Sequence, residues 1–143
     1  MIGVIVATHG KLAEELLNSA AMLVGSGRQM DCACVMPTMN PEEFLAETER
    51  KVAALDTGEG IVALVDILGG TPNNTLFRLS KKYNIRIVTG VNLSMVMYCV
   101  LERSDGMTAD ELIAVSYTHL AAKSTVHRVG QWKSRRSSQL RNV

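Results

Sequence analysis

Four short apolar runs, each followed by a segment of helical character, restrict the fold of this chain more than any other feature. The runs occupy residues 2–6, 30–36, 60–65 and 85–89. They are mostly continuous and rich in β-branched residues, as in parallel strands that helices cover on both faces. The alternation predicts an α/β fold, an open and mostly parallel sheet flanked by helices. We expect the flavodoxin-like strand order 2-1-3-4.

Helix signals separate the apolar runs. Residues 12–24 place Leu12, Leu16, Ala20 and Leu23 or Val24 at helical spacing, which predicts an amphipathic helix with these residues on its apolar face. Later start signals are Asn40 before Pro41, Thr71 as the N-cap before Pro72, and a capping box at 108–111. The helix after Pro72 is expected to carry Leu76, Phe77 and Leu79, and a further helix covers 93–101.

His9 follows the first apolar run, and Asp66 follows the third. In the expected strand order, both lie at the switch point, where ligands bind outside the carboxyl ends of the strands. A carboxylate that accepts a proton from one imidazole nitrogen fixes the tautomer and leaves the other nitrogen free as a nucleophile or base. The alternative interpretation is a partly buried His9 without chemistry and an Asp66 that only caps a strand end.

Glycine and threonine residues beside these two side chains predict an anion cradle. Gly10 follows His9, and Gly69, Gly70 and Thr71 precede a helix. Helix N-termini present unpaired N–H groups and the positive end of the helix dipole, which favours a phosphoryl group. We therefore predict His9 and Asp66 as catalytic residues and Gly10, Gly70 and Thr71 as phosphate-binding residues.

Charge divides the chain into two parts. Residues 1–116 hold all 14 acidic residues and 9 of the 15 Lys and Arg, whereas 117–143 hold six basic residues and no acidic one. We expect one domain over 1–116 and a basic tail over 117–143 that is disordered or non-native. One Trp and no patterned basic helix make nucleic-acid binding a weak interpretation of the tail, and no nucleic-acid partner is expected.

Other residues have simpler interpretations. Without a leader or a long apolar run, the chain is expected in the cytoplasm. Cys32 and Cys34 are expected to pack as small hydrophobes, because no Cys/His quartet has metal-ligand spacing. No metal and no organic cofactor are predicted. Met95 and Met97 suit the core or a subunit interface, and His119 and His127 are expected to be solvated.

Four motifs together resemble the IIA component of the mannose/fructose/sorbose family of the bacterial sugar phosphotransferase system. They are IVATHG at 5–10, MP at 36–37, VDILGGTP at 65–72 and TGVNL at 89–93. The resemblance covers roughly the first 115 residues. It implies that His9 accepts a phosphoryl group from the phosphocarrier protein HPr and passes it to a IIB component, with Asp66 as partner of the phosphohistidine. It also implies indirect coupling to membrane components IIC and IID, and a homodimer.

The same resemblance places Pro37 and Asn73 near the expected site. From Ser116 the chain departs from the family, whose members continue the fifth helix and close with a strand. Two alternatives stay open. One is the related phosphotransfer subunit that serves dihydroxyacetone kinase. The other is a non-catalytic flavodoxin-like ligand-binding module, although the sequence lacks G-x-G-x-x-G after its first strand.

Overall fold

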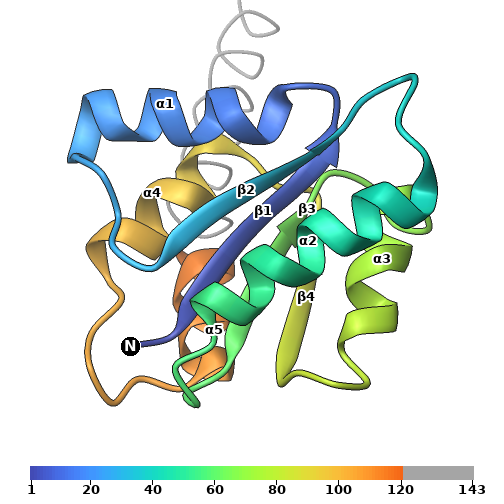
Figure 1. Cartoon of the computed structure of the whole chain (residues 1–143). Helices are drawn as coiled ribbons and strands as arrows, with labels where there is room; N and C mark the ends of the chain where they lie inside the picture. The colour runs from blue at the N-terminus through green and yellow to red at the C-terminus, as the bar shows by residue number, and fades with distance from the viewer. Residues whose placement is uncertain (121–143) are drawn as a thin grey trace, which may run out of the picture.

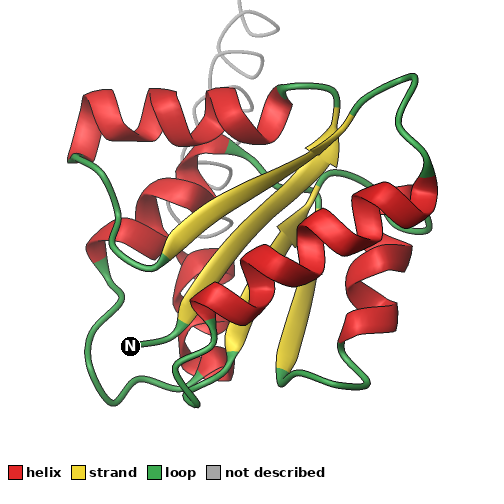
Figure 2. Cartoon of the chain, in the orientation of Figure 1, coloured by secondary structure: helices red, strands yellow, loops and turns green. Residues whose placement is uncertain are grey.

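One parallel sheet organises the molecule. The computed structural model describes residues 1–120, with side chains to 116. The elements in order are β1 (Gly3–His9), α1 (Leu12–Val24), β2 (Met30–Val35), α2 (Pro41–Leu55), β3 (Ile61–Val65), α3 (Thr71–Leu79), β4 (Ile85–Thr89), α4 (Leu93–Leu101) and α5 (Ala109–Leu120). The four strands are parallel in the order β2-β1-β3-β4, so the predicted topology is confirmed (Figures 1 and 2).

Helices cover both faces of this sheet. On one face, Val4 and Val62 pack with residues of α1, α4 and α5. On the other face, Ile5 and Ala63 pack with residues of α2 and α3, the two helices nearest the viewer in Figure 1. Alternate residues of β1 and β3 thus enter different cores, which is why their sequences are continuously apolar. The carboxyl edge of the sheet carries the loops that form the candidate site.

The apolar face of α1 differs from the prediction. Ala13 and Ala20 are fully or almost fully buried, and Leu16 and Leu17 pack at their flanks. Leu12 and Leu23 are instead exposed, at 46% and 62%. Small alanines at the centre of the buried face allow a helix to lie close to its neighbours, so the buried stripe is rotated away from the larger leucines.

The start of α3 also differs from the prediction. The helix begins at Thr71, and Gly70 is its N-cap with an extended backbone. The Gly70 carbonyl accepts the first helical hydrogen bond, from the Asn74 N–H at 2.9 Å, so Thr71 is already inside the helix. Phe77, expected on the apolar face, is 63% exposed because the buried stripe runs through Leu76 and Leu79.

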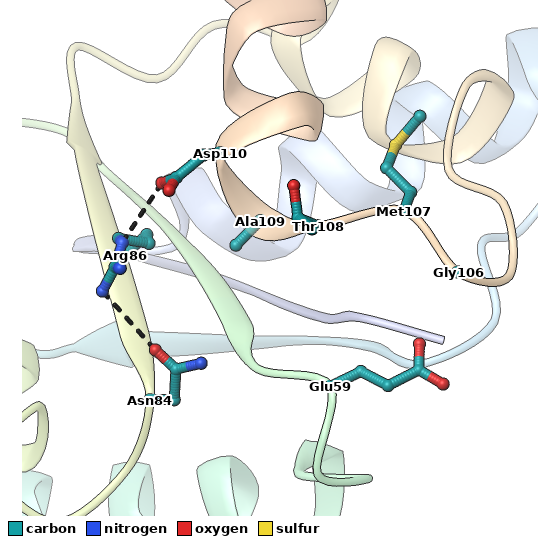
Figure 3. A pocket seen from close by; sticks show the side chains of 8 residues that line it. All are labelled: Glu59, Asn84, Arg86, Gly106, Met107, Thr108, Ala109 and Asp110. Carbon is teal, nitrogen blue, oxygen red and sulfur yellow. Dashed lines mark hydrogen bonds and ion pairs between the residues drawn. The ribbon is translucent and has the colours of Figure 1, made fainter.

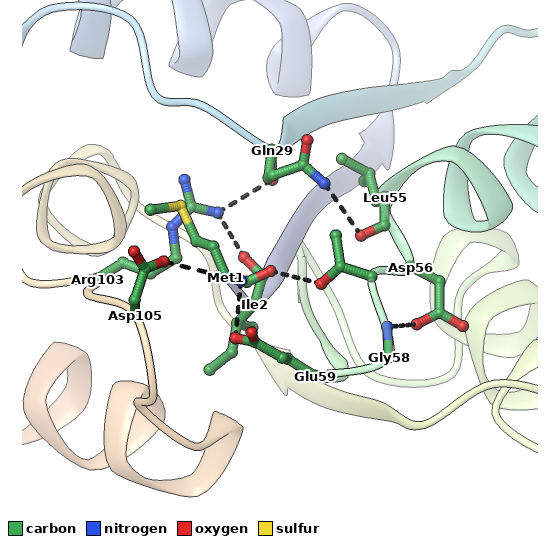
Figure 4. Close-up of polar contacts among 10 residues, drawn as sticks. Met1, Ile2, Gln29, Leu55, Asp56, Gly58, Glu59, Arg103 and Asp105 are labelled. Atoms are coloured by element: carbon green, nitrogen blue, oxygen red, sulfur yellow. Dashed lines mark hydrogen bonds and ion pairs between the residues drawn. The ribbon is translucent and has the colours of Figure 1, made fainter.

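A buried arginine, Arg103, joins the loop after α4 to the edge of the sheet that the amino ends of the strands form. The Arg103 guanidinium donates to the carbonyl of Ile2 at 2.8 Å and to that of Gln29 at 3.0 Å (Figure 4). It also donates to the carbonyl of Arg28. These carbonyls precede β1 and β2, so one side chain joins three segments that are distant in sequence. The hydrogen bonds of Arg103 therefore hold the amino-end edge of the sheet together.

Several smaller predictions have outcomes here. Cys32 and Cys34 are free thiols that pack against the core, as expected, and burial, together with Cys34, raises the pKa of Cys32 to about 11. Met95 is buried and Met97 packs beside it, which confirms the core interpretation. The main chain of α5 continues through the predicted boundary at 116 to Leu120.

The predicted basic tail lies outside the described residues, apart from the main chain of 117–120. The side chains of His119 and His127 are likewise outside the described part. Among the helices of residues 1–120, none combines the length and the apolarity that crossing a bilayer would require.

Candidate active site

The fold brings His9 and Asp66 into contact at the carboxyl edge of the sheet. His9 is the last residue of β1, and Asp66 directly follows β3, the strand that pairs with β1. Because Ala7 lies opposite Val65 in this pairing, the residues that follow them on the two strands leave the sheet side by side. The His9 side chain is 47% exposed and that of Asp66 is 15% exposed. The imidazole is therefore open to solvent while its carboxylate partner lies beneath it.

Asp66 holds His9 through two hydrogen bonds. Its Oδ2 atom lies 2.8 Å from the His9 ring Nδ1 and also accepts the His9 main-chain N–H at 2.8 Å. An ionised carboxylate only accepts hydrogen bonds, so Nδ1 carries the proton and Nε2 of the neutral ring keeps a free lone pair. In this arrangement Nε2 is the ring nitrogen that could act as a nucleophile or a base.

The Asp66 carboxylate is itself fixed in the charged state. Partial burial opposes its ionisation, but hydrogen bonds from the His9 N–H, the His9 ring and the Ile67 N–H outweigh burial and lower the pKa of Asp66. The Ile67 N–H reaches the second oxygen, Oδ1, at 2.9 Å. Behind it, the Gly90 N–H donates to the Asp66 main-chain carbonyl at 3.1 Å. Asp66 is thus oriented by main-chain groups from three loops, independently of the ring.

Gly70 lies against the free nitrogen side of the His9 ring. A Cβ placed on Gly70 would lie 2.7 Å from the ring Cε1 and 3.3 Å from Nε2, which is closer than a side chain tolerates. Gly70 is also the N-cap of α3, and it provides no side-chain hydrogen bond to that helix. The first turn of α3 therefore begins beside Nε2 with its N–H groups uncapped, and such groups favour an anion.

The remaining predicted residues surround this centre. Gly10 has a φ of +59° that suits glycine, and its N–H donates to the Val35 carbonyl at 2.9 Å, so this amide is already used. Thr71 is half-buried as the first residue of α3. Pro37 is exposed in the turn after β2, and Asn73 donates to Asn74 Oδ1 at 3.3 Å.

Two residues of this region were missed by sequence reasoning. The buried Thr8 hydroxyl accepts the Ala13 N–H at 2.7 Å and so closes the start of α1. Its signal was a threonine at a strand-to-helix junction, the residue type that caps helices. Asn74 donates from Nδ2 to the Gly69 carbonyl at 3.0 Å. In sequence it is an ordinary residue inside a helix.

Exposed apolar side chains gather at the same edge of the sheet. Leu12 opens α1, Met36 follows β2, and Ile67 and Leu68 follow β3; their exposed fractions range from 38% to 80%. All four come directly after the carboxyl ends of strands or at the helix start beyond one. We refer to Leu12, Met36, Ile67 and Leu68 as the apolar collar. Exposed apolar clusters of this kind are typical of surfaces that contact other proteins.

A hollow lies at the edge of the sheet formed by the amino ends of the strands, away from His9. It has a volume of about 320 Å³, and Asn84 and Arg86 line it beside Glu59 and the start of α5 (Figure 3). Arg86 pairs there with Asp110 at 3.2 Å. Among the described residues, no group of three or more His, Cys, Asp or Glu side chains is placed to hold a metal ion.

Comparison with known proteins identifies the family. The family model described as the PTS system fructose IIA component matches residues 3–116. The chain is 34% identical over 116 residues to the PTS system mannose-specific EIIAB component of Escherichia coli, covering 80% of this chain and 36% of that protein. It is 27% identical over 113 residues to the sorbose-specific EIIA component of Klebsiella pneumoniae, covering 78% and 82%. The chain thus spans about a third of the first relative and most of the second.

A solved structure agrees with this assignment. The phosphotransferase system component EIIA of Streptococcus agalactiae superposes with a TM-score of 0.74 at 30% identity, covering 82% of this chain and 91% of that one. The matched residues include both His9 and the loop that carries Asp66. The chain belongs to the mannose/fructose/sorbose family of PTS EIIA components, the sugar-specific IIA proteins of the phosphotransferase system.

Proposed function

We propose that this protein is a phosphoryl carrier, in which His9 Nε2 accepts a phosphoryl group from the phosphocarrier HPr and transfers it to a IIB component for sugar uptake. The observation that carries the proposal is the 2.8 Å contact between His9 Nδ1 and Asp66 Oδ2. It leaves Nε2 as the nucleophile and provides an acceptor for the Nδ1–H that a phosphohistidine retains.

The transfer needs one nucleophile and no separate base. The Nε2 lone pair forms a new P–N bond while the P–N bond of the donor phosphohistidine breaks, and the donor nitrogen keeps that electron pair. The His9 ring gains positive charge as the bond forms, and the ionised Asp66 beside Nδ1 stabilises it. Attack on the phosphoryl group by a IIB nucleophile reverses these steps and restores the neutral ring.

The start of α3 suits the phosphoryl oxygens. Gly70 lies beside Nε2, and the uncapped first turn of α3 follows it. We propose that N–H groups of this turn and the Thr71 hydroxyl donate to the phosphoryl oxygens, because an anion is favoured at a helix N-terminus. Gly10 then contributes a tight turn beside the ring, since its N–H is held by Val35. In this proposal Asp66 does not touch the phosphoryl group.

The apolar collar gives HPr and the IIB component a place to dock. Leu68 and Ile67 are 80% and 55% exposed and lie on the loop that follows Asp66. A partner that covers them also excludes water from His9, which limits hydrolysis of the phosphohistidine. We propose that both partners use this surface in turn. The homodimer stays a prediction, which light scattering on the purified protein can check.

Phosphorylation of the full chain tests the proposal. The protein is incubated with phosphoenolpyruvate, enzyme I and HPr, and its intact mass is measured beside His9→Ala. We expect one added phosphoryl group that is acid-labile, since phosphohistidine hydrolyses in acid, and none on the variant. Arg78→Ala is the control, because it changes an exposed residue of α3 whose partner is Glu42. It should accept the phosphoryl group at the wild-type rate.

The receiving partner separates the remaining alternatives. Transfer from the phosphorylated protein to a mannose-type IIB domain supports the sugar-uptake role. Transfer to the partner subunit of a dihydroxyacetone kinase and not to IIB would move the protein to that system. A folded wild-type protein that gains no phosphoryl group would contradict the carrier proposal and favour a ligand-binding module.

A further inference from the structure

The loop that touches His9 has unusual conformational freedom. Gly69 and Gly70 are consecutive, and Gly69 has a φ of +78°. Glycine loses more backbone entropy on ordering than other residues, so a Gly-Gly loop needs specific contacts to keep one conformation. Gly70 nevertheless lies in close contact with the His9 ring. Something outside the loop must hold it there.

Asn74 provides these contacts. Its side-chain Nδ2 donates to the Gly69 carbonyl at 3.0 Å, and its main-chain N–H donates to the Gly70 carbonyl at 2.9 Å. Two consecutive carbonyls of the loop are therefore bound to one residue of α3. Asn73 Nδ2 donates to Asn74 Oδ1 at 3.3 Å, which sets the orientation of the Asn74 amide. With its oxygen bound to Asn73, the amide presents its nitrogen to Gly69.

Fixing the loop also fixes the ring. Asp66 holds His9 at Nδ1, and Gly70 lies on the other side of the ring, where a Cβ would be 2.7 Å from Cε1 and 3.3 Å from Nε2. The imidazole therefore lies between Asp66 and Gly70. The Asp66 support rests on main-chain groups. The Gly70 support rests on the N–H of Asn74, which any residue provides, and on its side chain, which few others could replace. Loss of that side chain therefore loosens the nitrogen side of the ring.

We infer that Asn74 is a positioning residue for phosphorylation of His9: its side-chain amide holds the Gly69–Gly70 loop so that Nε2 and the first turn of α3 face one phosphoryl group. The inference rests on the proposed function for its kinetic consequence. The part of the inference that concerns the position of the His9 ring does not depend on the proposed function. Asn74 acts through Gly70 and does not itself contact the reacting atoms.

The test compares Asn74→Ala with Arg78→Ala in the full chain. Both substitutions remove an exposed polar side chain from α3, and Arg78 lies one turn further along. Single-turnover phosphorylation by phospho-HPr is measured, together with thermal unfolding. We expect the rate to fall about tenfold in Asn74→Ala, since misplacement by 1 Å costs about a hundredfold and a loosened loop costs less. Arg78→Ala should keep the wild-type rate at a similar melting temperature.

A spectroscopic measurement reports the ring directly. Long-range ¹H–¹⁵N spectra of histidine-labelled protein give the Nδ1 and Nε2 shifts of His9, which the His9→Ala spectrum assigns. Wild type should show Nδ1 protonated and Nε2 unprotonated in the neutral ring. Asn74→Ala should move both shifts toward the average of the two tautomers, while Arg78→Ala leaves them in place. Asn73→Ala, which removes only the 3.3 Å contact, should give a smaller change in the same direction.

Each outcome decides the inference. A wild-type rate and unchanged ring shifts in Asn74→Ala would overturn it, as would equal rate losses in Asn74→Ala and Arg78→Ala. If wild-type protein takes no phosphoryl group, the proposed function fails, and the ring shifts alone then decide whether Asn74 positions His9. Altered shifts with a lowered rate support both.

Discussion

The N-terminus of α5 is capped by side chains, whereas that of α3 is not. At α5, Glu111 Oε2 accepts the Thr108 N–H at 2.8 Å and its hydroxyl at 2.9 Å, and Thr108 Oγ1 accepts the Glu111 N–H at 3.3 Å. Arg86 of β4 also pairs with Asp110 in the first turn (Figure 3). At α3, Gly70 occupies the cap position and offers no side chain. The α5 terminus is closed by its own residues, whereas the α3 terminus has no side-chain cap.

The other helices resemble α5 in this respect. Asn40 accepts the Glu42 N–H at the start of α2, and Asn92 accepts the Met95 N–H at the start of α4. The N-cap of α1, Lys11, makes no side-chain hydrogen bond, but the Thr8 hydroxyl accepts the Ala13 N–H in the first turn. Capping oxygens are each worth about 1 kcal/mol. Leaving α3 without one sacrifices stability where His9 lies. The difference supports the proposal that the α3 terminus binds the phosphoryl group.

The largest effect that would break this contrast comes from a side chain at Gly70. Its φ of −76° and ψ of 171° suit alanine, but the new Cβ would lie 2.7 Å from His9 Cε1. We expect Gly70→Ala to fold normally, to displace the ring from Asp66 and to lower the phosphorylation rate about a hundredfold. Single-turnover transfer from phospho-HPr measures the loss.

Gly106, in the loop before α5, is the matched control. Its φ is +84°, and a Cβ there would meet nothing within 4 Å. Gly106→Ala should therefore strain the backbone by about 1–2 kcal/mol while leaving the phosphorylation rate unchanged. The two glycines thus separate steric contact with the site from backbone strain. Equal rates in Gly70→Ala and wild type would show that Gly70 does not support the ring.

A smaller effect is expected from the threonines at the two termini. Thr71→Ala should slow phosphorylation about tenfold, because one hydrogen bond to a charged group is worth about 1.5 kcal/mol or more. Thr108→Ala should instead lower the free energy of unfolding by about 1 kcal/mol through loss of the α5 cap, without slowing transfer. Urea unfolding and single-turnover kinetics on both variants measure whether Thr71→Ala affects mainly the rate and Thr108→Ala mainly the stability. A Thr71→Ala variant that loses stability and keeps its rate would contradict the proposed role of Thr71.

Much of the fold could be predicted from sequence, because strand runs and most helix caps are local signals. The apolar runs predicted all four strands in the correct order, and Asn40 and the 108–111 capping box marked two helix starts. The placement of His9 opposite Asp66 followed from topology alone. These features depend on residue types and on the rules of parallel sheets, which a single sequence contains.

The rest depends on contacts between distant segments. Thr71 followed by Pro72 has the local pattern of a cap, yet Gly70 takes that position because its carbonyl accepts the Asn74 N–H. The role of Asn74 arises from the loop that it faces. The buried face of α1 is likewise set by the surface beneath it, which selects Ala13 and Ala20.

Acid titration sharpens the comparison with the smallest expected effect, because each region carries a carboxylate that accepts main-chain N–H groups. The pKa of Asp66 is lowered from its ordinary value of 3.8 by its hydrogen bonds, against the opposing effect of burial, and that of Glu111 is lowered from 4.5 by Thr108. A lowered pKa in the folded state means that each carboxylate stabilises the fold above the ordinary value. The stabilisation is lost as the pH falls through the lowered one.

We therefore expect the difference in unfolding free energy between wild type and Asp66→Asn to shrink as the pH falls below about 4. Glu111→Gln should show the same trend from a slightly higher pH. Salt separates the two, because Glu111 is exposed and Asp66 is partly buried under His9. Urea titrations at low and high salt should weaken the Glu111 effect and leave that of Asp66 largely intact. Equal salt sensitivity would mean that both carboxylates are merely surface caps, and the contrast between the two termini would then rest on Gly70 alone.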